Sequence, residues 1–308
     1  MSRYSLPGTA RLKTVGALWR YHSQNVTNHA AHDYCNAYLK TVRDLGAFGI
    51  ETLRDKAVLD LGCGQRYHFS LLAAGAGARV VGLDVTSIEP RLSVAGIVRT
   101  SRRNGLLRAA KSAVRSVVFY RRYYSELERL SGVSRKAADG VSFLWSDPAV
   151  GSYPLQSEQF DLVVSIAVLE HVRDVPLVAK EIARVLKPGG LLYAFVHNYY
   201  SLSGGHRLEW AYPDREAPTD IEPWDHLRSR RWQPDYYLNR LRSDEYRGYL
   251  EAGLTVLQLE GRDEAHDAGG YEGERYLVGA AAEELRSYPR DLLLTRSWCI
   301  VARKPETA

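Results

Sequence analysis

Five continuous apolar runs, each about as long as a β-strand, constrain the fold of this chain most strongly. They occupy residues 57–64, 78–85, 141–145, 160–168 and 191–198. Runs without polar alternation are typical of parallel strands that are covered on both faces. Helical patterns at 66–75 and 174–186 lie between these runs. Strands and helices in alternation predict an α/β fold with a doubly wound, mostly parallel sheet and helices on both faces.

The carboxyl-terminal part predicts two more strands. A helix is expected over 236–253, followed by strands over 254–260 and 297–304, which gives a seven-stranded sheet whose last strand is antiparallel. We also expect the helix over 174–186 to stop at Lys187-Pro188-Gly189-Gly190, because proline and glycine do not continue a helix.

The pattern divides the chain into an N-terminal helical cap over 1–50 and a larger domain over 51–308. The cap helix, at 20–48, places five apolar side chains on one face: Tyr34, Tyr38, Leu39, Val42 and Leu45. The larger domain carries two insertions, a basic helical one over about 91–136 and an aromatic, histidine-rich one over 197–234.

The net charge of +5 is concentrated in the first insertion. Residues 91–136 contain 12 basic and two acidic residues, so the rest of the chain has a net charge of −5. Apolar positions from Leu107 to Leu130 recur at helical spacing. Such a helix could pack on the domain or on a second copy, lie on an anionic membrane, or bind an anionic substrate. Charge confined to one segment argues against nucleic acid as the partner.

Other features of composition indicate a cytoplasmic protein. Apolar residues make up 45% of the chain and charged residues 25%, as in ordinary globular domains. We find neither a window of about 18 apolar residues nor an apolar core behind the first basic residues, which argues against a membrane helix and a signal peptide. Cys35, Cys63 and Cys299 cannot all pair, which favours a reducing compartment.

Glycines and acidic residues follow the first three strands. Asp60, Gly62 and Gly64 accompany the end of the first strand, Asp84 ends the second, and Asp147 follows the third. Carboxyl ends of parallel strands form the ligand edge of such a sheet. Glycines let the backbone approach a ligand, and acids can accept hydrogen bonds from ribose hydroxyls and an exocyclic amine. The pattern predicts a positively charged ligand with a ribose and an amine-bearing base.

A nicotinamide dinucleotide is the main rival ligand. The turn GCGQRY lacks the third glycine that a pyrophosphate-binding turn needs, because Tyr67 occupies that position. The acid at Asp60 would also disfavour a pyrophosphate. We therefore reject the dinucleotide interpretation.

Four motifs in order carry a family resemblance: VLDLGCG (58–64), VVGLDV (80–85), FDLVVSIAVLEHV (160–172) and VLKPGGLLYAFVH (185–197). Together they resemble the seven-stranded class I methyltransferases that use S-adenosylmethionine. The resemblance implies that Gly62 and Gly64 flank the methionine part of the cofactor and that Asp60 binds its amino group. It also implies that Asp84 holds the ribose and Asp147 faces the adenine amine. The remaining expected cofactor contacts are Cys63, Val85, Pro148, Ser165 and Ile166.

One residue departs from the pattern of this family. Arg66 stands where members often have a further glycine. The backbone of the turn after the first strand can therefore follow a different path from that of the family, whereas the fold is unaffected.

The second insertion leaves the end of the fifth strand and predicts a lid with an aromatic floor, suited to a sugar ring or a flat acceptor. The alternative for this insertion is a packed cap with structural histidines. For Glu170, the alternative to a role near the cofactor is a favourable charge at the start of the following helix. The stretch PWDHLRSRR…YYLNRLRSDEY is similar to bacterial methyltransferases of glycan and secondary-metabolite pathways. The candidate substrate contacts are Glu170, Tyr199, Tyr200, His206, Trp210 and His226.

These features predict a methyltransferase of the EC 2.1.1 type that methylates a hydroxyl of a small acceptor, preferably a saccharide or natural product. A hydroxyl needs a base, and the candidates are His171 after the fourth strand and His197 at the end of the fifth. SAM-dependent amino-sugar methyltransferases also place a histidine after the fourth strand, which favours His171.

Several alternatives stay open. One is a nucleic-acid, lipid or quinone methyltransferase that uses the basic helix, and another is a SAM-binding protein without catalysis. A homo-oligomer is compatible with the sequence. Mg²⁺ is not indicated, although four residues could supply ligands: His206, Asp214, Asp220 and Asp225.

Overall fold

The computed structural model of the chain describes residues 25–90, 93–147, 152–206, 210, 221–228, 237–262 and 273–306. The chain forms two compact units. The first comprises Met1–Arg54, Gly64–Ala78 and Thr86–Ser142, and the second comprises Asp55–Cys63, Arg79–Val85 and Phe143–Ala308.

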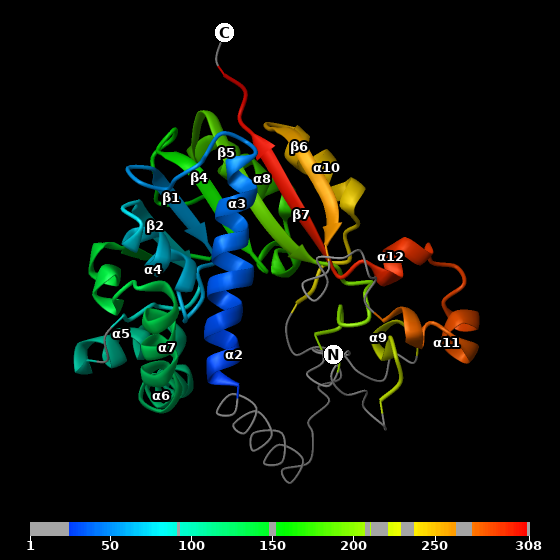
Figure 1. Ribbon diagram of the computed structural model, residues 1–308, viewed down its shortest axis with the longest axis horizontal. Helices are drawn as coiled ribbons and strands as arrows, with labels where there is room; N and C mark the ends of the chain where they lie inside the picture. The colour runs from blue at the N-terminus through cyan, green and yellow to red at the C-terminus, as the bar shows by residue number, and fades with distance from the viewer. Residues whose placement is uncertain are drawn as a thin grey trace. The chain divides into compact units, whose positions relative to one another are not determined.

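A seven-stranded sheet in the order β3-β2-β1-β4-β5-β7-β6 organises the second unit (Figure 1). β1 pairs in parallel with β2 and β4, and β4 pairs in parallel with β5, whereas β7 runs antiparallel to both β5 and β6. The predicted seven-stranded, mostly parallel sheet is therefore confirmed. Its strands are β1 (Ala57–Leu61), β2 (Arg79–Asp84), β3 (Ser142–Trp145), β4 (Phe160–Ile166), β5 (Leu186–His197), β6 (Thr255–Arg262) and β7 (Ser297–Arg303).

Helix α8 (Val175–Val185) buries one apolar face in the core of this unit. Asp174 caps its N-terminus by accepting a hydrogen bond from the Leu177 amide at 3.0 Å, and a proline stands in the first turn. Val178 and Ile182, one turn apart, are fully buried in the same cluster as the β4 and β5 side chains. The predicted helix over 174–186 is confirmed.

β5 begins earlier than the sequence predicts. The helix does end before Lys187, but Phe160 pairs with Leu186 and Leu162 with Leu191, so residues 187–190 bulge opposite Asp161. The Lys187 ammonium lies 2.8 Å from the Asp161 carboxylate and holds the bulge. Pro188, Gly189 and Gly190 thus follow the end of the helix directly as a bulged part of β5, with no loop between helix and strand.

The predicted helix over 236–253 is shorter in the structure. Helix α10 spans only Ser243–Glu251. The preceding residues leave the helical path because the Asn239 amide donates a hydrogen bond to the Glu170 carbonyl at 2.7 Å. Packing against the loop after β4 overrides the local helical pattern.

The first unit starts with a continuous helical rod. It consists of α2 (Val26–Ala31), a π-helical segment (His32–Leu39) and α3 (Lys40–Gly46). Tyr38 and Leu45 are buried as predicted, but Leu39 is exposed. The π segment explains the error, because its i→i+5 bonding changes the angular spacing of successive side chains.

The basic insertion forms three α-helices rather than one. α5 (Val94–Asn104) and α6 (Leu106–Arg115) are separated by Gly105 with φ +87°, and α7 (Arg121–Ser131) follows a π-helical segment (Ser116–Tyr120). α7 buries Tyr124 and Leu127 and packs on α2 (Figure 1), whereas Leu107 of α6 is 71% exposed. Packing of the insertion on the rest of the chain, one of the alternatives left open by the sequence, is thus observed for α7.

Short helices complete the two units. They are α4 (His68–Gly75) in the first unit, and α9 (Asp225–Arg228), α11 (Gly279–Glu284) and α12 (Arg290–Leu294) in the second. Side chains from the second insertion, from the residue beside α11 and from α12 form a small separate core: Leu202, Trp210, Trp224, Leu285, Leu293 and Leu294. Among the described residues, no helix is both long and apolar enough to cross a bilayer.

Candidate active site

The turn after β1 needs glycine at two positions. Gly62 and Gly64 have φ values of +77° and +64°, in the left-handed region. The Gly62 amide donates to the Leu83 carbonyl at 2.7 Å, which joins the turn to the end of β2. A Cβ on Gly62 would lie 2.3 Å from Cγ2 of Val168. The turn therefore leaves no space for a side chain at Gly62.

Two buried carboxylates flank this turn. Asp60 and Asp84 are both buried at the ends of β1 and β2. Burial raises the pKa of the Cys63 thiol well above its usual value, and the charges of Asp60 and Asp84 raise it further. Cys63 is therefore a protonated packing residue. Both carboxylates lie close enough to this thiol to raise its pKa. Cys35, Cys63 and Cys299 are all free thiols.

The end of β3 is joined to the end of β2. The Trp145 indole donates to the Val85 carbonyl at 2.9 Å, and the Ser146 amide donates to the Asp84 carbonyl at 3.1 Å. Val85 is 49% exposed, and Asp147 is exposed at the same edge of the sheet. Pro148, the other expected contact here, lies outside the described residues.

Ser165 and Ile166 stand at the end of β4. Ser165 is completely buried, and its hydroxyl has no hydrogen-bond partner among the described residues. A buried hydroxyl is usually satisfied, so a bound polar group is a physical explanation for this one. Two carboxylates, a glycine turn and this hydroxyl are a donor and acceptor set that suits the ammonium, ribose and sulfonium groups of S-adenosylmethionine.

Arg66 has a structural role within the first unit. Its guanidinium lies 3.0 Å from the Asp33 carboxylate, and its carbonyl accepts a hydrogen bond from the Tyr124 hydroxyl at 2.8 Å. The Tyr123 hydroxyl also donates to Asp33, at 2.6 Å. The residue that departs from the family pattern thus ties the segment after Gly64 to α7 and to the N-terminal helical rod.

Asp33 is the buried centre of this cluster. Burial raises its pKa, but the charges of His68 and Arg66 and the hydrogen bonds from His32 and Tyr123 outweigh burial, so its pKa is well below the usual value. Sequence reasoning missed Asp33. An acidic residue beside the apolar positions of the 20–48 helix was the available signal.

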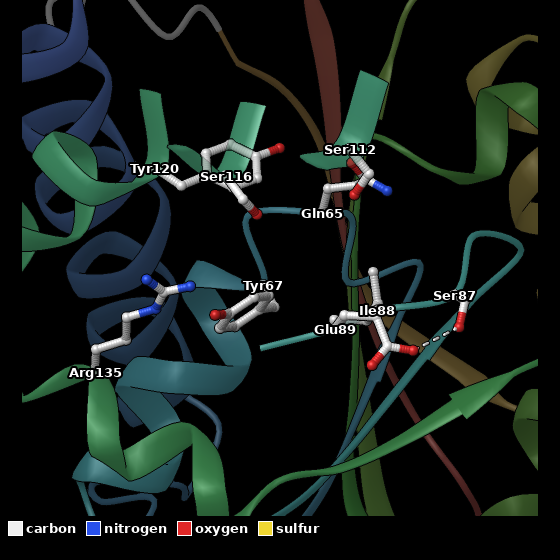
Figure 2. A pocket seen from close by; sticks show the side chains of 9 residues that line it. All are labelled: Gln65, Tyr67, Ser87, Ile88, Glu89, Ser112, Ser116, Tyr120 and Arg135. Atoms are coloured by element: carbon white, nitrogen blue, oxygen red, sulfur yellow. Dashed lines mark hydrogen bonds between the residues drawn. The ribbon is translucent and has the colours of Figure 1, made fainter. Parts of the chain in front are cut away.

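The first unit also contains a small polar hollow of about 10 Å³ (Figure 2). Figure 2 shows Arg135 and Tyr67 on one side of it, and on the other Ser87, whose hydroxyl donates to Glu89 at 3.3 Å. Hydroxyl, amide and ionised groups dominate its lining, and its volume is about that needed by one water molecule. The lining residues are Gln65, Tyr67, Ser87, Ile88, Glu89, Ser112, Ser116, Tyr120 and Arg135.

Three histidines meet at the carboxyl ends of β4 and β5 in the second unit. His171 ends the 3-10 helix Leu169–His171, His197 ends β5, and His206 lies in the second insertion. The His197 and His206 rings stack with centroids 4.5 Å apart, and the His171 ring meets His206 edge-on at 5.3 Å. The structure therefore brings both predicted bases together with one predicted substrate contact.

Hydrogen bonds orient two of these rings. Nδ1 of His171 lies 3.1 Å from the Tyr237 carbonyl oxygen, and Nε2 of His197 lies 2.9 Å from the Ser203 hydroxyl. Burial lowers the pKa of His171, lowers that of His197 well below its usual value, and lowers that of His206 to about 3. All three imidazoles are neutral at neutral pH.

The other predicted substrate contacts with aromatic rings interact with residues other than His171, His197 and His206. His226 Nε2 donates to the Tyr199 carbonyl at 2.9 Å, and the Tyr200 hydroxyl donates to the Arg240 carbonyl at 2.9 Å. Trp210 is buried in the small core, 5.1 Å from the Tyr276 ring, and the structure does not bring it into the histidine cluster. Glu170 is only 1% exposed, so it does not act as a surface charge at a helix start.

Asn239 is a positioning residue that the sequence did not reveal. Its side-chain amide donates to the carbonyls of Leu169 and Val172 at 2.7 and 3.1 Å, and its oxygen accepts from the Tyr246 hydroxyl at 2.8 Å. These bonds hold the loop that carries His171. An asparagine within an apparent helix is a weak signal of such a role, because asparagine is a poor helix former.

Comparison with known proteins identifies the family. The family model described as a methyltransferase domain matches residues 30–259. One curated relative, a ubiquinone biosynthesis O-methyltransferase of Chelativorans sp. (strain BNC1), is 36% identical over 59 residues. That match covers 19% of this chain and spans only 23% of the relative.

Solved structures of the same general fold are also similar to this chain. An S-adenosylmethionine-dependent methyltransferase from Mesorhizobium loti is 19% identical, with 85% of this chain and 96% of that chain covered and a TM-score of 0.46. A SAM-dependent methyltransferase from Methanosarcina mazei is 18% identical, with 82% and 94% covered and a TM-score of 0.44.

The sheet order and the matched family model agree with the resemblance found in the four sequence motifs. The prediction of a class I, S-adenosylmethionine-dependent enzyme is confirmed at the level of the family. The family model covers β1 to β5 and the first part of β6. The chain belongs to the methyltransferase-domain family.

Proposed function

We propose that this chain transfers the methyl group of S-adenosylmethionine to a hydroxyl oxygen of a small polar acceptor, preferably a saccharide or natural product. The proposal is carried by the 3.1 Å contact between His171 Nδ1 and the Tyr237 carbonyl oxygen. A carbonyl oxygen accepts hydrogen bonds and donates none, so Nδ1 carries the proton and Nε2 keeps its lone pair. His171 is thus held in the tautomer that a general base requires.

The cofactor would be held at the ends of β1, β2 and β3. The Asp84 carboxylate suits the ribose hydroxyls, the Asp60 carboxylate suits the ammonium group, and Asp147 suits the adenine amine. The bound cofactor supplies a methyl group already activated by a positively charged sulfur. The buried Ser165 hydroxyl supports a polar ligand at the end of β4.

The residues of the chain then have two tasks. Alignment of the acceptor oxygen with the methyl carbon is worth about 7–11 kcal/mol in favourable systems. As the oxygen–carbon bond forms and the carbon–sulfur bond breaks, Nε2 of His171 takes the hydroxyl proton, a step worth roughly 10²–10⁴-fold in rate. Asn239 and Tyr237 keep the histidine in place through their bonds to its loop and ring.

A lipid or quinone acceptor is the second candidate. Leu106 and Leu107 of α6 are 80% and 71% exposed within the strongly basic segment, a combination suited to a membrane surface. The partial match to a ubiquinone biosynthesis O-methyltransferase is in keeping with this class of acceptor.

An acceptor screen that measures S-adenosylhomocysteine release tests the proposal. Each hydroxylated sugar or natural product is paired with its deoxy and amino analogues, and a quinol is presented in anionic vesicles. We expect release with a hydroxylated acceptor and none with its deoxy analogue. Release only with the amine, with the vesicle-bound quinol, or with RNA or DNA would overturn the saccharide or natural-product assignment.

A further inference from the structure

Glu170, His197 and His206 form a compact group of potential metal ligands in the second unit. One ligand atom from each residue lies within 4.8 Å of those of the other two. The three residues come from separate elements: the 3-10 helix after β4, the end of β5 and the second insertion. From this geometry we infer that Glu170, His197 and His206 form a divalent-metal site whose occupant is Zn²⁺.

The chemistry of the three ligands favours zinc over magnesium. Two imidazoles and one carboxylate form a set found in catalytic zinc sites, which keep a fourth position open for water or substrate. Mg²⁺ prefers oxygen ligands and retains several waters. Of the four possible ligands considered from the sequence, this cluster contains only His206, and Asp214 and Asp220 lie outside the described residues.

The surroundings of the triad orient its members. The Ser203 hydroxyl contacts Nε2 of His197, which leaves Nδ1 of this ring for an ion. The amide of His206 donates to the Ser203 carbonyl at 2.8 Å, so one residue supports both histidines. The contact between the Ser203 hydroxyl and His197 is the one that involves a ring nitrogen. A hydrogen bond to the ring nitrogen that does not bind the metal sets the tautomer and ring orientation of a ligating histidine.

The separation of the ligand atoms is compatible with closure on an ion. Zinc bonds of about 2.0–2.2 Å place tetrahedral ligand atoms about 3.4 Å apart. The three ligand atoms lie within 4.8 Å of one another, so binding of an ion would draw them closer together. Burial of the Glu170 carboxylate also favours a cation, because a buried negative charge is stabilised by a positive ion at short range.

The role of the ion rests on the proposed function. The open position would bind the acceptor hydroxyl oxygen and lower the pKa of that hydroxyl. The His171 ring lies nearly perpendicular to the His206 ring, with centroids 5.3 Å apart, so the base stands beside the ligand set without belonging to it. The ion would thereby favour deprotonation of the acceptor by His171.

Cobalt binding tests the site directly and independently of activity. The full chain is stripped with a chelator and titrated with Co²⁺, and the visible d–d absorption of the protein-bound ion is recorded. We expect absorption typical of a four- or five-coordinate site, with displacement of cobalt by Zn²⁺. Glu170→Gln and His206→Gln should weaken cobalt binding more than about 10-fold, and Ser203→Ala by about 10–100-fold.

His171→Gln is the matched control. It alters a histidine that touches the triad but falls outside the ligand set, so cobalt affinity should stay within about twofold of wild type. Circular dichroism and calorimetric titration with S-adenosylmethionine show whether each variant is folded. Absence of the cobalt bands in the wild-type chain, or full cobalt affinity in folded Glu170→Gln and His206→Gln variants, would overturn the inference.

Failure of the metal site and failure of the proposed function give different results. Methyl transfer by chelator-treated protein that binds no cobalt would contradict the metal site and leave O-methylation standing. Cobalt binding with the expected variant pattern, but no S-adenosylhomocysteine with any hydroxylated acceptor, would support the site and contradict the proposed function.

Discussion

The Val168 side chain packs against the backbone of Gly62, so closely that a Cβ on Gly62 would lie 2.3 Å from it. This contact connects the turn after β1 with the loop after β4. Val168 lies just before the 3-10 helix that carries His171. The turn proposed to hold the cofactor and the loop proposed to hold the base are therefore packed directly against each other. A side chain at Gly62 would disturb both.

Gly62→Ala should lower stability more than Gly64→Ala does. Both positions have positive φ values, which cost an alanine about 1–2 kcal/mol. At Gly62 the new Cβ would also overlap the Val168 side chain, which should lower the free energy of unfolding by about 1–3 kcal/mol more. A Cβ at Gly64 would meet no described atom within 4 Å. Thermal unfolding of the two variants measures the difference. Equal melting temperatures would contradict the close packing of the two loops.

Asp84→Ala should weaken S-adenosylmethionine binding by about 10–150-fold. The change removes charge-assisted hydrogen bonds to the ribose, worth roughly 1.5–3 kcal/mol. Calorimetric titration measures the affinity. Asp244→Asn, which alters an exposed carboxylate in the first turn of α10, should leave it unchanged. Wild-type affinity in Asp84→Ala would remove this residue from the cofactor site.

His171→Ala should reduce kcat by about 10²–10⁴-fold and change S-adenosylmethionine affinity little, because the imidazole acts on the acceptor proton. Asn239→Ala should also lower kcat, since it removes two hydrogen bonds that hold the same loop. Steady-state kinetics and calorimetry separate the two effects. A full rate in His171→Ala would show that the acceptor needs no base at this position.

Asp33→Asn should lower the free energy of unfolding by about 1.5–3 kcal/mol at pH 7, because it removes the charge that accepts the Tyr123 hydrogen bond and pairs with the partly exposed Arg66 guanidinium. The folded-state pKa of Asp33 lies well below its unfolded value of about 3.9. Its stabilising contribution is therefore complete above that value and is lost as the pH falls toward the folded-state pKa.

Urea unfolding of the wild type and Asp33→Asn at pH 7, 5 and 3 measures this contribution. The difference in unfolding free energy between the two proteins should stay constant from pH 7 to 5 and shrink at pH 3. A difference that does not change with pH would contradict the assignment of a charged, buried Asp33.

Residues at the ends of the strands were predictable because local patterns place them. Apolar runs locate β1 and β2, so Asp60 and Asp84 follow at the ligand edge of any parallel sheet. His171 and His197 could be located in the same way, from the ends of β4 and β5. The family resemblance then supplied the chemistry of the ligand.

Contacts made by irregular segments could not be predicted from local patterns. His206 reaches His197 only because the second insertion turns back on itself at Ser201–His206, where His206 adopts φ +55°. Asn239 was assigned to a helix because nothing in its neighbourhood shows that its amide bonds to the loop after β4. The pairing of Asp33 with Tyr123, 90 residues apart, depends on tertiary packing in the same way.

The central claim is methyl transfer to a hydroxyl oxygen, and the most direct test follows the methyl group itself. The protein is incubated with S-adenosylmethionine bearing a trideuterated methyl group and the best hydroxylated acceptor of the screen, and both products are quantified by mass spectrometry. We expect equal amounts of S-adenosylhomocysteine and of acceptor labelled on oxygen. Bound cofactor without transfer of label to any acceptor, or label found on nitrogen or carbon, would contradict the central claim.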